Sequence, residues 1–226
     1  VAPDAEITLE ANPDDLTPEK IRAIRDTPVN RFSIGVQSFF EEDLRFMNRA
    51  HRAQEAFDCI ERAQAAGFSD LTIDLIYGSP TTTNERWLQN LEYAFTMGIP
   101  HLSCYCLTVE PKTALDHFVR QGKVAPVDEA RASRQFELLL ERSESAGYEQ
   151  YEISNFAKNE RYARHNTAYW LVSDLPHTHL MDSPASGILP IMRCTSRPWT
   201  KRRKRFPTIF SNGRSYLRIC GITNTL

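Results

Sequence analysis

Four polar side chains stand at the ends of segments that have the pattern of β-strands, namely Glu10, Gln37, Asp74 and Thr108. Each of the segments is short and rich in apolar, β-branched or aromatic residues, which is typical of strands. In α/β barrels and open α/β sheets, ligands bind at the edge where parallel strands end. The sequence therefore predicts a binding site for a polar ligand at this edge. Taken singly, each residue could instead cap a helix or pair with a neighbour, so the prediction depends on their recurrence at successive strand ends.

The segment from residue 31 to residue 51 is the centre of this pattern. Phe32, Ile34 and Val36 alternate with Ser33, Gly35 and Gln37, which predicts a strand that ends at Gln37. Acidic residues at 41–43 favour the first turn of a following helix, and a basic pair, Arg49 and His51, comes just beyond it. Further strands are predicted over 6–10, 71–77, 101–109 and 148–156. Helices are predicted from Thr17 and over 53–66, 83–97 and 128–146, several of them ended by glycine.

Strand and helix alternate four times in this pattern, which indicates βαβ units and a parallel sheet. Such units wind with a right-handed crossover into a barrel or an open doubly wound sheet. Because polar residues recur at the strand ends, the pattern favours a barrel with its site at the carboxyl-terminal rim.

Composition sets limits on the function. The chain has 226 residues, enough for one large domain or one and a half small ones, and its net charge of −2 does not suggest a general nucleic-acid binder. No apolar run reaches the ~20 residues of a membrane span, and no secretory signal is visible. The five cysteines are odd in number and fit no disulfide framework, which favours a reducing cytoplasm. A start at Val1, directly before a strand, suggests that an upstream segment is missing.

Six motifs in order resemble a known family. They are Leu-Glu-Ala-Asn-Pro at 9–13, Ser-Ile-Gly-Val-Gln-Ser-Phe at 33–39, Asn-Arg-Ala-His at 48–51, Ile-Asp-Leu-Ile-Tyr-Gly at 73–78, Tyr-Glu-Gln-Tyr-Glu-Ile-Ser-Asn-Phe-Ala at 148–157 and His-Asn-Thr-Ala-Tyr-Trp at 165–170. Together they resemble the radical S-adenosylmethionine (SAM) proteins of the oxygen-independent coproporphyrinogen III oxidase family. The last two resemble the branch regarded as haem chaperones. The resemblance implies a partial (β/α)6 barrel that holds SAM and a [4Fe-4S] cluster.

The resemblance also assigns roles to the rim residues. It implies that Glu10 binds the amino group of SAM, that Gln37 hydrogen-bonds the ligand and that Arg49 meets the SAM carboxylate. Asp74 would accept hydrogen bonds from the ribose hydroxyls, and Thr108 would line the same rim. No residue is assigned a catalytic role.

His165 is the candidate for haem, because its imidazole could be an axial ligand of the iron. The alternative is a loop histidine that is hydrogen-bonded to Asn166 or to the backbone. The residue types leave both interpretations open.

Two features depart from the family. The three cysteines spaced Cys-x3-Cys-x2-Cys, which hold the family's cluster, are absent, as is the glycine-rich segment that follows them. A cluster needs thiolate ligands, so this chain alone is expected not to bind it or to cleave SAM. Beyond residue 170 no helical or strand period is sustained, and 193–205 is a basic run. We expect residues 171–226 to be an out-of-frame, disordered tail, because a one-base shift permits a continuation similar to the family.

The sequence thus divides into a partial radical SAM barrel at 1–147, the start of a family-specific region at 148–170 and the tail at 171–226. The predicted function is that of a fragment of a radical SAM haem chaperone, a cytoplasmic protein that binds haem and delivers it to client proteins. An oxygen-independent coproporphyrinogen III oxidase is the alternative. A barrel hydrolase or aldolase lacks a lysine base at a strand end, and a nucleic-acid module would fit only the basic run, without an aromatic platform.

Overall fold

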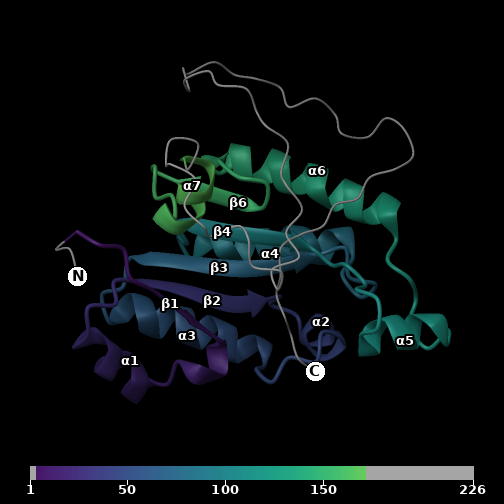
Figure 1. The fold of residues 1–226 in the computed structure, drawn as a ribbon, viewed down its shortest axis with the longest axis horizontal. Coiled ribbons are helices and arrows are strands. Elements are labelled where there is room, and N and C mark those ends of the chain that lie inside the picture. Colours follow the sequence, from purple (N-terminus) through teal and green to yellow (C-terminus); the bar gives the residue numbers. More distant parts are fainter. Residues whose placement is uncertain (1–3, 172–226) are drawn as a thin grey trace, which may run out of the picture. The chain divides into compact units, whose positions relative to one another are not determined.

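The computed structural model describes residues 4–171 of the chain (Figure 1). Of the predicted tail at 171–226, residues 172–226 lie outside the described residues. The strands are β1 (Thr8–Ala11), β2 (Arg31–Gln37), β3 (Asp70–Tyr77), β4 (His101–Cys106), β5 (Tyr148–Gln150) and β6 (Asn155–Lys158). The helices are η1 (Pro13–Asp15), α1 (Pro18–Arg25), α2 (Glu41–Phe46), α3 (Ala53–Ala65), α4 (Asn84–Thr96), α5 (Ala114–Arg120), α6 (Glu129–Ser145) and α7 (Arg164–Leu171).

The strands form a mixed sheet in the order β1-β2-β3-β4-β6-β5. Strands β1 to β4 are parallel neighbours, which confirms the βαβ units predicted from the alternation. Strand β6 then pairs antiparallel with β4, and β5 pairs antiparallel with β6. The sheet is therefore parallel where the family-like motifs at 9–78 lie and antiparallel where the 148–157 motif joins it.

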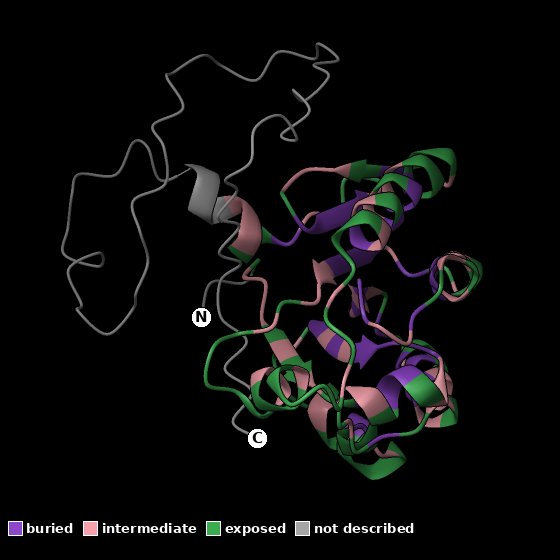
Figure 2. Ribbon diagram, turned by 90° about the vertical axis from the view of Figure 1, so that its right-hand side faces the viewer, coloured by how far each residue is buried: buried purple, intermediate pink, exposed green. Residues whose placement is uncertain are grey.

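The two faces of the sheet differ in chemistry because side chains alternate along each strand. One face is apolar and packs against the helices; it includes Phe32, Ile34, Val36, Leu71, Ile73, Leu75, Leu102 and Phe156. Trp87 and Leu91 of α4 and Ile60 of α3 are fully buried against it. The other face is polar and includes Arg31, Ser33, Thr72, Asp74, His101, Ser103 and Asn155. Figure 2 shows the strands largely buried, with the exposed residues on the outer sides of the helices.

Local signals in the sequence place the main helices. The hydroxyls of Thr17 and Thr83 and the carboxylate of Asp128 accept hydrogen bonds from the first turns of α1, α4 and α6. Gly67, Gly98 and Gly147 follow α3, α4 and α6 with φ between +69° and +88°, the left-handed conformation in which helices commonly end. The helices predicted over 53–66, 83–97 and 128–146 are thus confirmed to within one residue at each end.

Two local predictions were wrong, and helix α5 was missed. The strand predicted over 148–156 is two strands, β5 and β6, joined by a turn in which the side chain of Glu152 accepts a hydrogen bond from the backbone N–H of Ser154. The strand predicted to reach residue 109 ends at Cys106, so Thr108 lies beyond the sheet. Helix α5 was not predicted, because it has only seven residues and its sequence shows no sustained apolar period.

Candidate functional site

Glu10 and Asp74 lie on the polar face of the sheet, Glu10 near the carboxyl end of β1 and Asp74 in the middle of β3. Glu10 is exposed and pairs in register with Ser33, whereas Asp74 is half-buried and pairs in register with Ser103. Burial and the negative charge of Glu10 raise the pKa of Asp74 to about 7, against lowering contributions from the Ser103 hydroxyl and from Arg49. The pair therefore forms an electronegative site that favours cations and hydrogen-bond donors.

Gln37 ends β2 in a strained conformation. Its φ is +65°, and the register between β2 and β3 is irregular between Ile34 and Gln37. The side chain is 2% exposed, yet its Oε1 atom is buried with no hydrogen-bond partner among the described residues. A Cβ atom at Gly35 would lie 3.1 Å from Nε2 of Gln37, so only glycine leaves the amide its present space. A strained, incompletely bonded amide at a strand end is typical of a ligand-binding position.

A buried polar network holds the end of β2 in place, and sequence reasoning missed it. Asp43 is 0% exposed, and its two carboxylate oxygens accept hydrogen bonds from Ser38 Oγ at 2.9 Å and Thr81 Oγ1 at 2.6 Å. Asn90 accepts from the backbone N–H of Phe39 at 2.7 Å and donates to Ser38 Oγ at 3.1 Å. The network ties the residues that follow Gln37 to the loop that follows β3. The residue that could have indicated this network in the sequence is Asp43, which the sequence analysis interpreted only as part of the first turn of a helix.

Arg49 reaches the same region from the turn after α2. The residue before it, Asn48, has a φ of +51°, which reverses the chain. Arg49 is half-buried, and burial lowers its pKa while the charge of Asp74 opposes that shift. Its Nε atom is buried without a hydrogen-bond partner in the described part of the chain. The structure therefore brings Glu10, Asp74 and Arg49 into electrostatic contact and leaves Arg49 with capacity for an anionic group.

The other residues singled out near this edge have weaker claims. The Thr108 hydroxyl is exposed and donates to Glu110 Oε1 at 3.4 Å, so it lies past the strand end without a contact to the four residues above. His51 is buried, its Nε2 lies 3.1 Å from the carbonyl oxygen of Val36, and burial lowers its pKa. A neutral, hydrogen-bonded His51 is therefore a structural residue that supports β2.

His165 lies at the opposite edge of the sheet, where the parallel strands begin (the amino edge); the carboxyl edge is the one where they end. It is an exposed residue of α7, whose neighbouring Arg164 donates its backbone N–H to Glu6 Oε1 at 3.0 Å, just before β1 begins. Arg161 donates to the carbonyl oxygen of Ser69 and to Asp70, where β3 begins. Figure 1 shows α7 and α5 at opposite ends of the strands. The structure therefore does not bring His165 together with the residues predicted to bind SAM.

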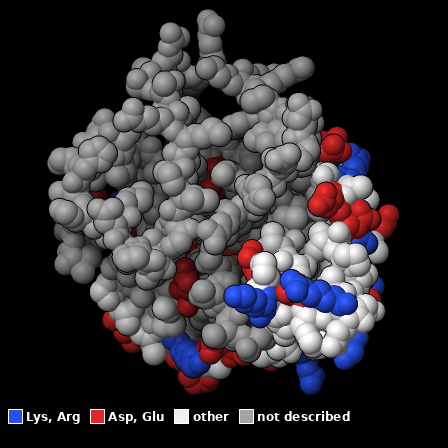
Figure 3. All heavy atoms as spheres, turned by 45° about the vertical axis from the view of Figure 1, so that its right-hand side comes forward, with Lys and Arg blue, Asp and Glu red and all other residues white. Residues whose placement is uncertain are grey.

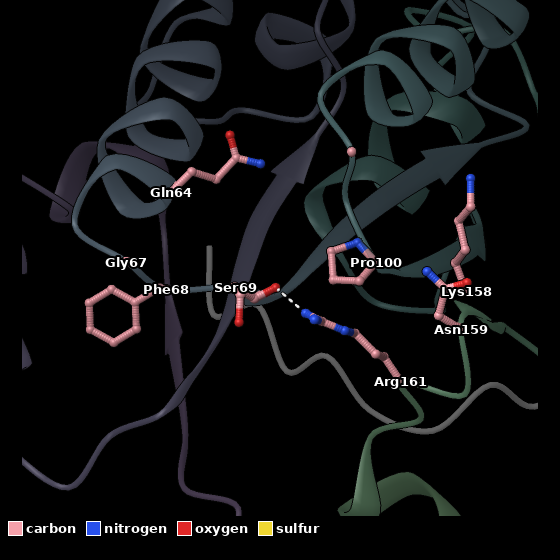
Figure 4. A pocket seen from close by; sticks show the side chains of 9 residues that line it. Gln64, Gly67, Phe68, Ser69, Pro100, Lys158, Asn159 and Arg161 are labelled. Carbon is pink, nitrogen blue, oxygen red and sulfur yellow. Dashed lines mark hydrogen bonds between the residues drawn. The ribbon is translucent and has the colours of Figure 1, made fainter.

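Two open cavities also lie at this amino edge. One, of about 470 Å³, is lined by Gln64, Gly67, Phe68, Ser69, Gly98, Pro100, Lys158, Asn159 and Arg161 (Figure 4). The other, of about 350 Å³, contains Arg31, Arg161 and Arg164 together with Asp4, Glu6 and Asp70. Each of these arginines is paired with one of the acids, at 3.0–3.8 Å. The charges in the second cavity therefore neutralise one another, and none of the predicted site residues lines either cavity.

The cysteines of the described residues lie in the core or against it. Cys59 and Cys104 are buried in the core, where burial raises the pKa of Cys59 to about 12. Within residues 4–171 no three His, Cys, Asp or Glu side chains gather closely enough to hold a metal ion. On the face drawn in Figure 3, basic and acidic side chains of the described residues are interspersed. Among the same residues no helix is both long and apolar enough to cross a membrane.

Comparison with known proteins agrees with the motifs. Residues 1–94 match the radical SAM superfamily model. The chain is 36% identical over 166 residues to the haem chaperone HemW of Bacillus subtilis, which covers 74% of this chain and 44% of that protein. It is 40% identical over 174 residues to HemW of Escherichia coli, covering 77% of this chain and 45% of that protein. The chain thus spans less than half the length of these relatives.

Solved structures show the same relationship. The coproporphyrinogen III oxidase HemN from Escherichia coli, a radical SAM enzyme, superposes with a TM-score of 0.60 at 26% identity over 70% of this chain and 36% of that one. The archaeal Elp3 from Methanocaldococcus infernus shares the fold, with a TM-score of 0.51 at 21% identity over 56% of this chain and 30% of that one. The mixed sheet is therefore a radical SAM fold, and the chain contains a radical SAM domain and is similar in sequence to the haem chaperones named HemW.

Proposed function

We propose that this chain supplies the SAM-binding part of a radical SAM haem chaperone. The observation that carries the proposal is a pair of polar atoms that are buried without partners in the described residues: Arg49 Nε, whose side chain acts electrostatically on Asp74, and Gln37 Oε1, at the carboxyl end of β2. Buried polar atoms are normally hydrogen-bonded, so a cluster of unpaired ones favours a missing ligand.

The chemistry of these residues fits SAM. The carboxylate of Glu10 would hold the ligand's ammonium group, and the guanidinium of Arg49 would hold its carboxylate. Asp74 would accept hydrogen bonds from the ribose hydroxyls, and Gln37 would complete its own bonding with a donor of the ligand. Thr108 would line the outer rim. These roles orient the ligand along the carboxyl edge; none of them requires a residue to transfer a proton.

The described cysteines do not fit a [4Fe-4S] cluster. A cluster of this kind needs several thiolates at one place, whereas Cys59 lies on α3 and Cys104 and Cys106 lie on β4, with Cys104 in the core. We therefore assign no reaction step to these residues. In a haem chaperone assembled with such a cluster, the residues of this chain would bind and orient SAM.

Haem would bind at the other edge, with His165 as an iron ligand. His165 is exposed on α7, so a planar ligand can reach it. Strands rise about 3.3 Å per residue, so a strand such as β3 separates the two edges by roughly 20 Å. The proposal therefore places haem and SAM at separate sites, from which haem would be handed to client proteins.

Binding measurements test the SAM proposal. Isothermal titration with SAM should show weak binding to the chain and at least about tenfold weaker binding after Glu10→Gln or Asp74→Asn, because each change removes a charge-assisted hydrogen bond. Glu19→Gln, the same change at an exposed position on α1, should leave the affinity unchanged. Equal affinities for Glu10→Gln, Asp74→Asn and wild type would contradict the proposal.

Absorbance titration with haem tests the second site. His165→Ala should weaken binding and alter the Soret band, because an axial ligand is lost. His117→Ala removes an exposed histidine of α5 and is the matched control. Identical spectra for wild type and His165→Ala would reject ligation by His165.

The alternative is a coproporphyrinogen III oxidase, which the superposition on HemN favours. The motifs at 148–157 and 165–170 favour the chaperone instead. An assay of a protein that contains this chain together with the cluster-binding segment separates the two. Formation of protoporphyrinogen would establish the oxidase, and transfer of haem to a client protein without that product would establish the chaperone.

A further inference from the structure

Three polar side chains form a row across the polar face of the sheet. Asp74 on β3 is the register partner of Ser103 on β4, and Ser103 is the register partner of Asn155 on β6. Register neighbours on one face contact each other. Ser103 Oγ donates to Asn155 Oδ1 at 2.8 Å, and its register partner on the other side is Asp74, whose pKa the Ser103 hydroxyl lowers as a hydrogen-bond donor. Ser103 and Asn155 are buried at 3% and 5% exposure, so water does not compete freely for these contacts.

Glu152 fixes the orientation of the Asn155 amide. Glu152 Oε2 accepts hydrogen bonds from Asn155 Nδ2 at 2.6 Å and from the backbone N–H of Ser154 at 2.9 Å. An ionised carboxylate only accepts, so the amide must present its NH2 group to Glu152. The amide oxygen must then face Ser103. Asn155 Oδ1 therefore accepts a hydrogen bond from the Ser103 hydroxyl.

Ser103 has a single hydroxyl hydrogen, for which Asn155 Oδ1 and the carboxyl group of Asp74 compete, and the Tyr105 hydroxyl is a further hydrogen-bond partner of Ser103. When Asp74 is protonated, its carboxyl group donates to Ser103 Oγ, Ser103 donates to Asn155, and every contact in the row is satisfied. When Asp74 is ionised, the carboxylate attracts the Ser103 hydrogen more strongly than a neutral amide oxygen does. Asn155 Oδ1 then loses its donor. The row thus favours one ionisation state of Asp74 over the other.

We infer that Asn155 and Glu152 are positioning residues that act through Ser103 to disfavour the ionised form of Asp74, and so tune when this carboxylate can accept hydroxyl donors from a bound ligand. The inference rests on the proposed SAM site, because Asp74 is the ribose-binding residue there. It assigns a role in the SAM site to the 148–157 motif, which contains none of the residues proposed to contact SAM.

The other groups that face Asp74 act on the same equilibrium. Glu10 on β1 disfavours the ionised form, and Arg49 on the turn after α2 favours it. Burial raises the pKa values of the Cys104 thiol and the Tyr105 hydroxyl of β4, and the nearby charge of Asp74 adds to both shifts. Burial adds to the effect of Glu10, and together they place the pKa of Asp74 at about 7. Small changes in the row therefore change the ionised fraction near neutral pH.

A double-mutant cycle on the full chain without ligand tests the inference. Asn155→Leu removes the competing acceptor, so Ser103 donates to Asp74 permanently, and the midpoint of the Asp74 titration should fall by about one pH unit. In a Ser103→Ala background the same substitution should leave the midpoint unchanged. The midpoint is read from the side-chain carboxyl ¹³C signal of Asp74, assigned with Asp74→Asn. An equal shift in both backgrounds, or no shift in either, would overturn the inference.

A gentler variant guards against misfolding of Asn155→Leu. Glu152→Gln lets the amide of Asn155 turn round and donate to Ser103, which again sends the Ser103 hydrogen to Asp74. Its effect should be larger in the wild-type background than with Ser103→Ala, where only the loss of the Glu152 charge remains. Equal effects in the two backgrounds would count against the row.

The outcome for SAM binding is independent of this cycle. If the cycle shows coupling but no variant binds SAM, the row stands and the proposed function fails. If SAM binds but the cycle shows no coupling, the function stands and the row fails. If both hold, Asn155→Leu should extend SAM binding about one pH unit toward lower pH.

Discussion

The two edges of the sheet contain similar residues in different states of pairing. At the amino edge, Arg31 is 3% exposed and donates to Thr72 Oγ1 at 2.7 Å, and it lies 3.6 Å from Glu6. His101 there shares a 2.6 Å hydrogen bond with the Tyr151 hydroxyl, and burial and the charge of Arg31 lower its pKa to about 3. At the carboxyl edge, Gln37 and Arg49 have buried polar atoms without partners in the described residues.

The difference distinguishes polar residues that stabilise the fold, at the amino edge, from polar residues that are available to a ligand, at the carboxyl edge. A buried polar group without a partner costs about 1–3 kcal/mol, which folding tolerates where a ligand supplies the missing bond. The amino edge has one such atom, His101 Nδ1, beside an otherwise paired set of side chains. We therefore expect substitutions at the amino edge to change stability, and substitutions at the carboxyl edge to change ligand affinity while leaving or increasing stability.

The largest expected effect concerns the pH dependence of stability. The pKa of Asp74 is raised from 3.8 to about 7 on folding, so between these values the folded chain binds more protons than the unfolded chain. Stability from this group therefore falls as pH rises from about 4 to 7, by up to about 4 kcal/mol. Asp74→Asn removes this loss, so the variant should exceed wild type in urea unfolding at pH 8 and approach it at pH 4.5.

Asp70→Asn on the same strand is the matched control. Asp70 belongs to the amino edge and pairs with Arg161 at 3.0 Å, and both side chains are more than 40% exposed. Its loss should slightly destabilise the chain at pH 8, by less than about 1 kcal/mol, which is the opposite sign. If Asp74→Asn also destabilises at pH 8, the contrast between the edges is wrong.

Arg31→Met should give the next largest effect. The substitution keeps the volume but leaves Glu6 without its guanidinium partner in a largely buried position, and breaking such a pair costs about 3 kcal/mol. Urea unfolding at pH 7 measures the loss, while SAM affinity corrected for the folded fraction should stay at the wild-type value. Arg134→Met, at an exposed pair with Glu137, should cost less than about 0.5 kcal/mol. A loss of affinity without loss of stability would assign Arg31 to the ligand.

Much of the fold could be predicted because its signals are local. Alternation along β2 and β3 and the spacing of Trp87, Leu91 and Ala94 are visible in the sequence, as are the caps at Thr17 and Thr83. The turn inside 148–156 was missed because it depends on tertiary contacts. After the turn, β6 pairs antiparallel with β4, with Asn155 opposite Ser103, and this pairing is not visible in the local sequence. Apolar and polar residues alternate through the turn as they would in one strand.

The site could be predicted in part. The strand patterns identified Glu10, Gln37 and Asp74, although Asp74 lies in the middle of β3 and not at its end. The strain at Gln37, the buried network of Asp43 and the row through Ser103 could not be predicted, because each depends on contacts between residues far apart in the chain. The opposite position of α7 was also missed, since nothing near His165 in the sequence states which edge it joins.

Gln37 offers a smaller test in which strain and ligand binding are separated. Its φ of +65° costs little in glycine but about 1 kcal/mol in other residues. Gln37→Gly should therefore be about 1 kcal/mol more stable than Gln37→Ala in urea unfolding. Both should lose SAM affinity to the same extent, since both lack the amide. Equal stabilities would mean that the backbone relaxes at this position, and unequal affinities would mean that the amide is not the contact.

The smallest expected effect is a nearly unchanged SAM affinity in a variant of the amino edge, which follows from the contrast between the two edges. His165→Ala should change SAM affinity by less than about 0.5 kcal/mol and stability by a similar amount, because His165 is exposed and sits at the amino edge. The same variant should weaken haem binding if the proposed haem site is correct. A loss of SAM affinity in His165→Ala would mean that the two edges communicate. We expect such coupling to pass through the row from Asn155 to Asp74, which links β6 to β3, and it should then disappear in the Ser103→Ala background.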